Sequence, residues 1–110
     1  MSSGKPEYPV NEGDVKTPPM HPGELLREVV LPELRMSVAE VASKLGVTRQ
    51  TLYRIIRERT AVTPEMAVRL GKFCDNGPNL WMALQTKYDL WHAERRLKDA
   101  IDRIQPARRG

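Results

Sequence analysis

The segment Ser37–Arg57, SVAEVASKLGVTRQTLYRIIR, predicts two short helices joined by a tight turn. Apolar residues recur where two such helices must bury against each other, at Val41, Leu45, Val47, Leu52 and Ile55. Ala42 is small where the helices are expected to cross. Gly46 follows the first helix, where a left-handed backbone is favourable only without a Cβ atom. Together these features predict a helix-turn-helix unit, which can place its second helix in the DNA major groove.

Capping signals fix where these and the later helices begin. Ser37 with Glu40 predicts a capping box over 38–45, and Thr48 can cap a helix over about 48–58. Thr63-Pro64-Glu65 is a further helix start, because it combines a cap, a first-turn proline and an early acid. Asn76-Gly77-Pro78 interrupts the chain and starts the last helix at Pro78.

The same register turns polar and basic side chains outward on the second helix of the unit. The candidate DNA contacts are Ser37, Thr48, Arg49, Gln50, Tyr53, Arg54, Arg57 and Arg59. Arg can bond guanine in a bidentate manner, and Gln can do the same to adenine. We therefore expect Arg49 and Gln50, in the first turn, to read base edges. Arg57 and Arg59 should hold phosphates, and Arg54 can do either. The alternative is a merely solvated basic face.

Length and charge describe one small domain with a local basic patch. The chain has 110 residues and a formal net charge of +4, all of it carried by 44–59. Such a patch on a helix that reads DNA is the pattern expected for phosphate binding. A core of this size is thin, so oligomerisation would add stability. The single cysteine, Cys74, excludes a disulfide framework and a cysteine-based metal site, which suits the cytoplasm. No apolar run is long enough for a secretory signal or a membrane span.

We expect an all-α chain in three parts. Residues 1–19 are proline-rich and predict a disordered leader, 20–92 the DNA-binding domain, and 93–110 a helical extension with a basic tail. The first of five helices begins at Pro22, with an apolar stripe at Leu25, Leu26, Val29 and Val30, and Pro32 should bend or end it. The last helix is the longest and ends at Pro106. A heptad-like seam runs along it through Leu90, Ala93, Leu97, Ala100 and Ile104.

Four segments carry a family resemblance: HPGELL at 21–26, SVAEVASKLGVTRQTLYRII at 37–56, TPEMAVRL at 63–70 and PNLWMALQTKYDLW at 78–91. The core resembles the XRE-type helix-turn-helix of lambdoid repressors, a five-helix fold. Over residues 20–91 the chain is similar to the HigA-type, VapI-like antitoxins of type II toxin–antitoxin systems.

This resemblance implies a small dimeric repressor. The sequence shows neither a phosphate loop nor paired catalytic carboxylates, so we expect no enzymatic activity and no cofactor. Its partners would be double-stranded operator DNA, a second copy, and a RelE/HigB-like mRNA endonuclease toxin, with no membrane. The protein would neutralise that toxin and repress the shared operon. A stand-alone XRE-type repressor is the alternative. The operator and the toxin's identity do not follow from the sequence.

The remaining clusters of chemically interesting residues have two interpretations each. Trp81, Leu84, Tyr88 and Trp91 form a helical stripe that is either core or dimer interface, rather than a platform for stacking bases. The toxin-binding candidates are Glu24 and Glu28, or the acids of the leader, or Leu97, Ile101 and Ile104. Solvated carboxylates are the alternative for the glutamates. Cys74 with His21 or His92 could suggest a nucleophile pair, but an inert thiol and a helix-start histidine are favoured.

Overall fold

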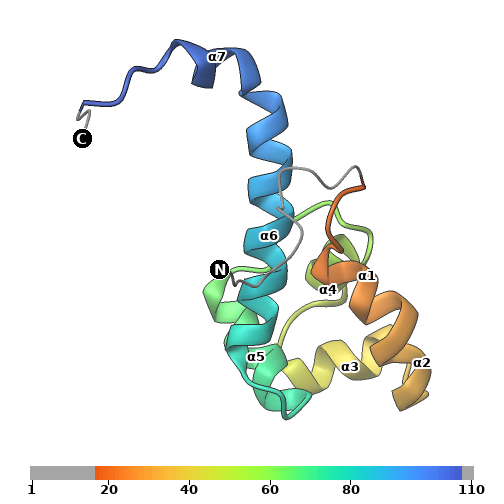
Figure 1. The fold of residues 1–110 in the computed structure, drawn as a ribbon. Helices are drawn as coiled ribbons and strands as arrows, with labels where there is room; N and C mark the ends of the chain where they lie inside the picture. The colour runs from red at the N-terminus through yellow and green to blue at the C-terminus, as the bar shows by residue number, and fades with distance from the viewer. Residues whose placement is uncertain (1–16, 108–110) are drawn as a thin grey trace, which may run out of the picture.

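The computed structural model describes residues 17–107, and that part of the chain is helical without strands (Figure 1). The elements are α1 (Pro22–Leu25), the π-helical η2 (Leu26–Val30), α2 (Leu31–Leu34), α3 (Val38–Leu45), α4 (Arg49–Ile56), α5 (Pro64–Phe73), α6 (Pro78–Arg96) and α7 (Lys98–Arg103). The predicted all-α fold is confirmed. The predicted leader, 1–19, lies almost entirely outside the described residues.

The first predicted helix is one run, α1–η2–α2, whose middle turn is wider than an α-helix. In η2 the Leu31 N–H donates to the Leu26 carbonyl, five residues back. Pro32 lies just beyond this turn. A proline lacks the N–H and its ring clashes with the carbonyl four residues earlier, so a wider turn before it lets the helix continue. The run then ends at Leu34, and Arg35 takes the left-handed conformation with φ 56°.

This wide turn also changes which side chains are buried. Leu26 is buried, and Leu25 and Val30 pack partly against the core. Val29, which was expected on the same apolar stripe, is 41% exposed. A π turn adds a residue to the local repeat, so the regular α-helical spacing assumed for this stripe does not hold there.

The last predicted helix is wrong in one respect, because it is not continuous to Pro106. Leu97 departs from helical geometry, with φ −101° and ψ 14°, and separates α6 from α7. Leu97, Ile101 and Ile104 are all exposed. Figure 1 shows α7 turning away from the body of the molecule, so the predicted seam has no protomer surface to pack on.

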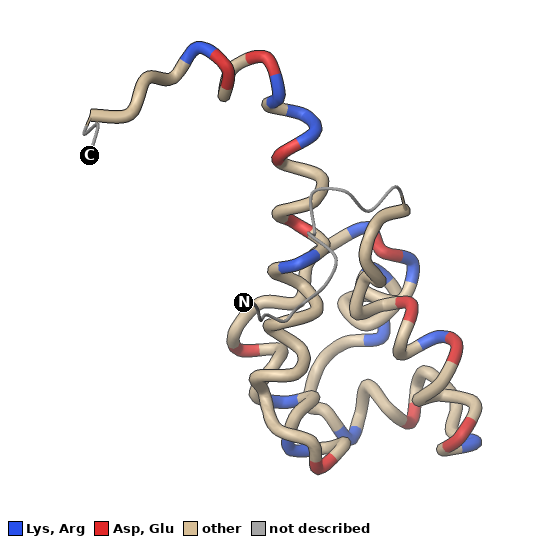
Figure 2. The backbone as a smooth tube through the Cα atoms, viewed as in Figure 1, with Lys and Arg blue, Asp and Glu red and all other residues tan. Residues whose placement is uncertain are grey.

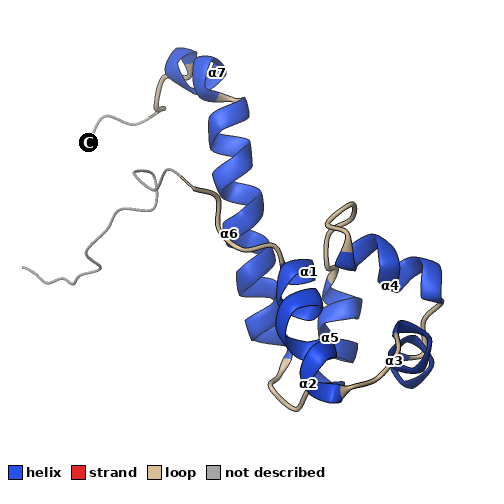
Figure 3. Ribbon diagram, turned by 90° about the vertical axis from the view of Figure 1, so that its right-hand side faces the viewer, coloured by secondary structure: helices blue, strands red, loops and turns tan. Residues whose placement is uncertain are grey.

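The core lies between the helix-turn-helix and the helices on either side of it. Its buried apolar residues are Leu26, Val41, Ala42, Leu45, Leu52, Ile55, Ile56, Val62, Met66, Ala67, Leu70 and Trp81. Five of the residues on which the helix-turn-helix prediction rested are therefore confirmed as core, and Val47 is partly buried. Figure 3 shows α3 and α4 at the right-hand side of the bundle, α5 at its centre and α6 to the left.

Two polar side chains anchor α6 to this core. The Trp81 Nε1 donates to the Asn76 Oδ1 at 3.0 Å. The Gln85 Oε1 accepts from the Val62 N–H at 2.7 Å, and its Nε2 donates to the Asp89 Oδ1 at 2.9 Å. Buried polar groups need such partners. Gln85 therefore fixes the loop before α5 against α6, a role that the hydrophobic pattern did not predict.

Candidate DNA interface

The two helices of the helix-turn-helix are capped as predicted. The Ser37 Oγ accepts from the Glu40 N–H at 3.1 Å, and the Glu40 Oε1 accepts from the Ser37 N–H at 3.0 Å, which completes the capping box. The Thr48 Oγ1 accepts from the Thr51 N–H at 3.1 Å. Gly46, between the helices, has φ 77°. These bonds fix where α4 starts and which way its first turn faces.

Burial of one face of α4 presents the opposite face to solvent. Leu52, Ile55 and Ile56 are buried. The outer side carries an open hollow of about 490 Å³, lined by Gln50, Tyr53, Arg54, Arg57, Arg59 and Thr60. We call this hollow the reading face. The structure thus brings together five of the eight candidate DNA contacts. Arg49 is exposed at the start of α4 but does not line the hollow, and Ser37 and Thr48 cap helices.

An aromatic contact holds one of these cations in place. The Arg57 guanidinium lies over the Tyr53 ring, 4.8 Å from its centroid. A guanidinium on an aromatic face is attracted by the ring quadrupole and loses rotamer freedom. Tyr53 is therefore placed to position Arg57.

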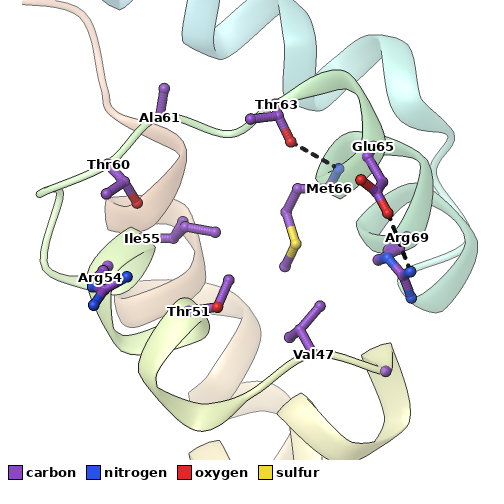
Figure 4. A pocket seen from close by; sticks show the side chains of 11 residues that line it. Val47, Thr51, Arg54, Ile55, Thr60, Ala61, Thr63, Glu65, Met66 and Arg69 are labelled. Atoms are coloured by element: carbon purple, nitrogen blue, oxygen red, sulfur yellow. Dashed lines mark hydrogen bonds and ion pairs between the residues drawn. The ribbon is translucent and has the colours of Figure 1, made fainter.

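A second hollow, of about 450 Å³, lies on the other side of Arg54, between α4 and α5 (Figure 4). Val47, Ile55 and Met66 give it apolar surface, and Thr51, Thr60 and Thr63 add hydroxyls. Arg54 and Thr60 line both hollows. This shared position gives Arg54 access to two neighbouring surfaces.

Two arginines from the flanking helices satisfy the carbonyl ends of the helix-turn-helix. The Arg69 Nη1 of α5 donates to the Leu45 carbonyl at 2.8 Å. The Arg27 Nη1 of η2 donates to the Ile56 carbonyl at 2.6 Å. The last carbonyls of a helix have no intrahelical partner, and a cation there also complements the helix dipole. Sequence reasoning missed both arginines, because each belongs to a different helix from the one it caps.

The residues proposed for dimerisation and toxin binding differ in how far they are exposed to solvent. Trp81 is 0% exposed, so its assignment to a dimer interface is wrong and its assignment to the core is right. Leu84, Tyr88 and Trp91 are half-buried. Glu24 is also half-buried rather than exposed. Glu28 is exposed and pairs with Arg27 at 3.0 Å, so these two glutamates do not form one equally open acidic face.

His21 and Cys74 occupy structural positions at helix ends. His21 is buried, and its Nδ1 accepts from the Gly23 N–H at 2.8 Å, which confirms it as a helix-start residue. The Tyr88 ring contacts His21 and His92, with ring centroids 4.8 Å and 4.3 Å apart. Cys74 is the C-cap of α5, and burial raises the pKa of its thiol. A raised pKa disfavours the reactive thiolate, as expected for an inert cysteine.

Burial of His21 predicts a pH-dependent stability. Desolvation lowers the pKa of His21 below 6.5, although Glu58, Asp89 and the Thr60 backbone oppose that shift. The unfolded chain therefore takes up a proton at higher pH than the native state. The stabilisation is present above about pH 6.5 and is lost as the pH falls toward the native pKa.

His21→Asn tests whether His21 causes the loss of stability at low pH, because Asn keeps a cap acceptor but does not titrate. We expect the melting temperature of the wild type to fall more than that of the variant between about pH 7.5 and pH 5.5. Thermal unfolding in matched buffers measures both curves. Parallel curves would assign the acid sensitivity to other groups.

The described part of the chain offers neither a membrane span nor a metal cluster. None of the helices in 17–107 is long and apolar enough to cross a bilayer. Within the same residues, no group of three or more His, Cys, Asp or Glu side chains is placed to hold a metal ion.

An exposed basic helix, held by capped neighbours in a helix-turn-helix, defines a DNA-binding module. The family described as Helix-turn-helix matches residues 26–81. An uncharacterized HTH-type transcriptional regulator of Haemophilus influenzae is 36% identical over 91 residues, covering 81% of this chain and 85% of that protein. The chain therefore belongs to the helix-turn-helix family.

Two solved structures of antitoxins have the same fold. The Pseudomonas aeruginosa antitoxin HigA with the higBA promoter is 37% identical, with a TM-score of 0.76, over 82% of this chain and 99% of that one. The antitoxin GraA in complex with its operator is 40% identical, with a TM-score of 0.76, over 86% of this chain and 99% of that one. Both relatives are thus described together with DNA.

Proposed function

We propose that this protein is a sequence-specific DNA-binding antitoxin that represses its own operon in the cytoplasm. The observation that carries the DNA-binding part is the reading face, where three arginines, a glutamine and a tyrosine line one hollow on the outer side of α4. The named relatives, two antitoxins each with promoter or operator DNA, support the rest.

In this proposal α4 enters the major groove with its N-terminal turn at the base edges. Arg49 and Gln50 reach bases, and Arg57 and Arg59, just beyond the far end of α4, hold phosphates. Arg54 lies between the two hollows and can follow either the bases or the backbone. Thr60, which was not predicted, adds a hydroxyl to the phosphate end.

Single substitutions should sort these roles. We expect Arg49→Ala or Gln50→Ala to cost about 1–3 kcal/mol on operator DNA and to relax discrimination at one or two base pairs. Arg59→Ala should instead weaken operator and scrambled DNA alike and reduce the salt slope by about one. Binding isotherms on both DNAs over a salt series measure this. Unchanged discrimination in both Arg49→Ala and Gln50→Ala would show that another surface reads the operator.

The proposed oligomer is a two-fold dimer, because one recognition helix covers only a few base pairs. The far half of α6 offers an exposed apolar centre, with Leu90 56% exposed. Lys87, Leu90, Trp91 and Glu94 line a hollow of about 170 Å³ there. Figure 2 shows charges of both signs along this part of α6 and α7. If two copies of α6 pack antiparallel about a two-fold axis midway between Leu90 and Trp91, Lys87 of each lies opposite Glu94 of the partner subunit.

This arrangement predicts a rescue by charge exchange. Lys87→Glu should place like charges across the axis twice and yield monomers with weakened operator binding. Adding Glu94→Lys to the same chain should restore the dimer. Light scattering at micromolar concentration reports the oligomeric state, and a wild-type monomer with and without DNA would contradict the dimer itself.

The proposed toxin partner is a basic RNA-cleaving protein of the RelE/HigB class, held on a surface other than the reading face. Glu28, which is exposed, and Glu24 beside it are the acidic candidates on the first helix. Co-purification with the product of the neighbouring gene tests the partnership. A protein that bound its operator but captured no such product would be a stand-alone repressor.

A further inference from the structure

The short loop that follows α4, residues 57–60, is held by the first helix of the fold. The Arg27 guanidinium of η2 donates through Nη1 to the Ile56 carbonyl at 2.6 Å and through Nη2 to the Glu58 Oε2 at 3.0 Å. The Glu58 side chain is 29% exposed and that of Arg27 is 40% exposed, so water screens this pair only in part. The planar Arg27 guanidinium thus bonds both the end of α4 and the loop beyond it.

Glu58 is also the residue at which the chain reverses. Its φ is 61°, a left-handed conformation that is uncommon for a residue with a Cβ. The next residue, Arg59, donates its N–H back to the Arg54 carbonyl at 2.8 Å. The reversal therefore sends the Glu58 carboxylate toward Arg27 while its two neighbours in sequence, Arg57 and Arg59, line the reading face.

We propose that Arg27 and Glu58 are positioning residues for DNA binding, although neither lines the reading face. Their ion pair, together with the bond from Arg27 to Ile56, fixes the loop conformation in which Arg57 and Arg59 project to the same side. Without it the loop becomes mobile, and each arginine must lose that freedom when it meets a phosphate. This inference rests on the proposed DNA-binding function.

Whether Glu58→Ala raises or lowers the affinity for operator DNA distinguishes a positioning role from a purely electrostatic one. Glu58→Ala removes a negative charge from the neighbourhood of the reading face. Charge alone would make the variant bind DNA more tightly. We call the two bonds from Arg27, to the Ile56 carbonyl and to Glu58, the clamp. The clamp predicts the opposite, an affinity for operator DNA about tenfold weaker, with a salt slope smaller by about one. Glu58→Gln, which keeps an oxygen acceptor for Arg27, should fall between the wild type and Glu58→Ala.

The matched control is Glu33→Ala, which removes the same charge from an exposed position on α2. We expect it to bind operator DNA as tightly as the wild type or slightly more tightly. On the other side of the pair, Arg27→Lys keeps the charge but cannot make both bonds in one plane, so it should weaken binding as Glu58→Ala does. Active fractions from stoichiometric titration exclude unfolding as the cause of any loss.

Hydrogen exchange tests the clamp without DNA. The Arg59 amide should exchange faster in Glu58→Ala than in the wild type, because its bond to Arg54 opens more often. Glu58→Ala that bound DNA as tightly as Glu33→Ala, or an unchanged exchange rate at Arg59, would overturn the proposal. A wild type that failed to discriminate operator from scrambled DNA would instead refute the proposed function, and the exchange result would still judge the clamp.

Discussion

Gly23→Ala should destabilise the domain by about 3 kcal/mol or more, the largest effect that we expect of a single methyl group. A Cβ at Gly23 would lie 1.9 Å from the Ile55 carbonyl oxygen and 2.9 Å from its carbon. Both are backbone atoms at the end of α4, so they cannot move aside as a flexible side chain can. Helix propensity alone would favour alanine by roughly 1 kcal/mol, so the clash must outweigh it. Thermal and denaturant unfolding measure the loss.

Gly46→Ala is the comparison that isolates the clash. Gly46 has φ 77°, and a Cβ there would meet the Arg69 Nη1, the end of a flexible side chain, at 2.8 Å. The strain should cost about 1–2 kcal/mol, chiefly through the left-handed backbone. Equal losses in the two variants would mean that α1 does not approach α4 as closely as the structure shows.

The helix-turn-helix and its reading face could be predicted because their determinants are local. Ser37, Glu40, Gly46 and Thr48 act within one or two turns of themselves, and the structure confirms the capping roles of Ser37, Glu40 and Thr48 and the left-handed turn at Gly46. The apolar spacing of Leu52 and Ile55 then fixes which face of α4 is left for the polar side chains. Local capping and periodicity together were therefore sufficient.

Features that depend on contacts between distant segments could not be predicted in this way. Arg27 and Arg69 resemble any exposed arginine of an amphipathic helix, yet they bond carbonyls 29 and 24 residues away. Trp81 is buried because of the way α6 packs on the other helices. Helical spacing alone does not decide whether such a residue lies in the core or at an interface. The break at Leu97 has a related origin, because apolar periodicity continues past the point where the protomer offers something to pack against.

The contacts of Arg27 also link the proposed DNA-binding and toxin-binding surfaces of this small domain. The first helix carries Glu28, a proposed toxin contact, and Arg27, which bonds both Glu28 and the loop after α4. The proposed toxin surface and the loop after α4 are thus distant in sequence, yet both meet the Arg27 guanidinium, which bonds Glu28 through Nε and Glu58 through Nη2. Separate surfaces can bind their partners together, whereas a shared surface forces competition.

Arg54→Ala/Arg57→Ala should abolish operator binding and leave toxin neutralisation intact. Each arginine lines the reading face, and loss of both should weaken operator affinity about a hundredfold or more. Both side chains are exposed, so the fold should tolerate the change. Operator binding is measured by titration, and neutralisation by growth when the variant is co-expressed with the product of the neighbouring gene.

The complementary variant, Glu24→Lys/Glu28→Lys, should show the reverse pattern. It reverses the charge that a basic toxin would seek and changes no residue that lines the reading face, so growth rescue should fall. Because Glu28 also pairs with Arg27, operator binding is measured beside Arg27→Lys and should fall less than in that variant. Full rescue by this variant would move the toxin site elsewhere, with the apolar surface of Leu97, Ile101 and Ile104 as the next candidate. Loss of rescue in a folded Arg54→Ala/Arg57→Ala protein would mean that DNA and toxin compete for one face. Neutralisation and repression would then be alternatives rather than simultaneous states of the same dimer.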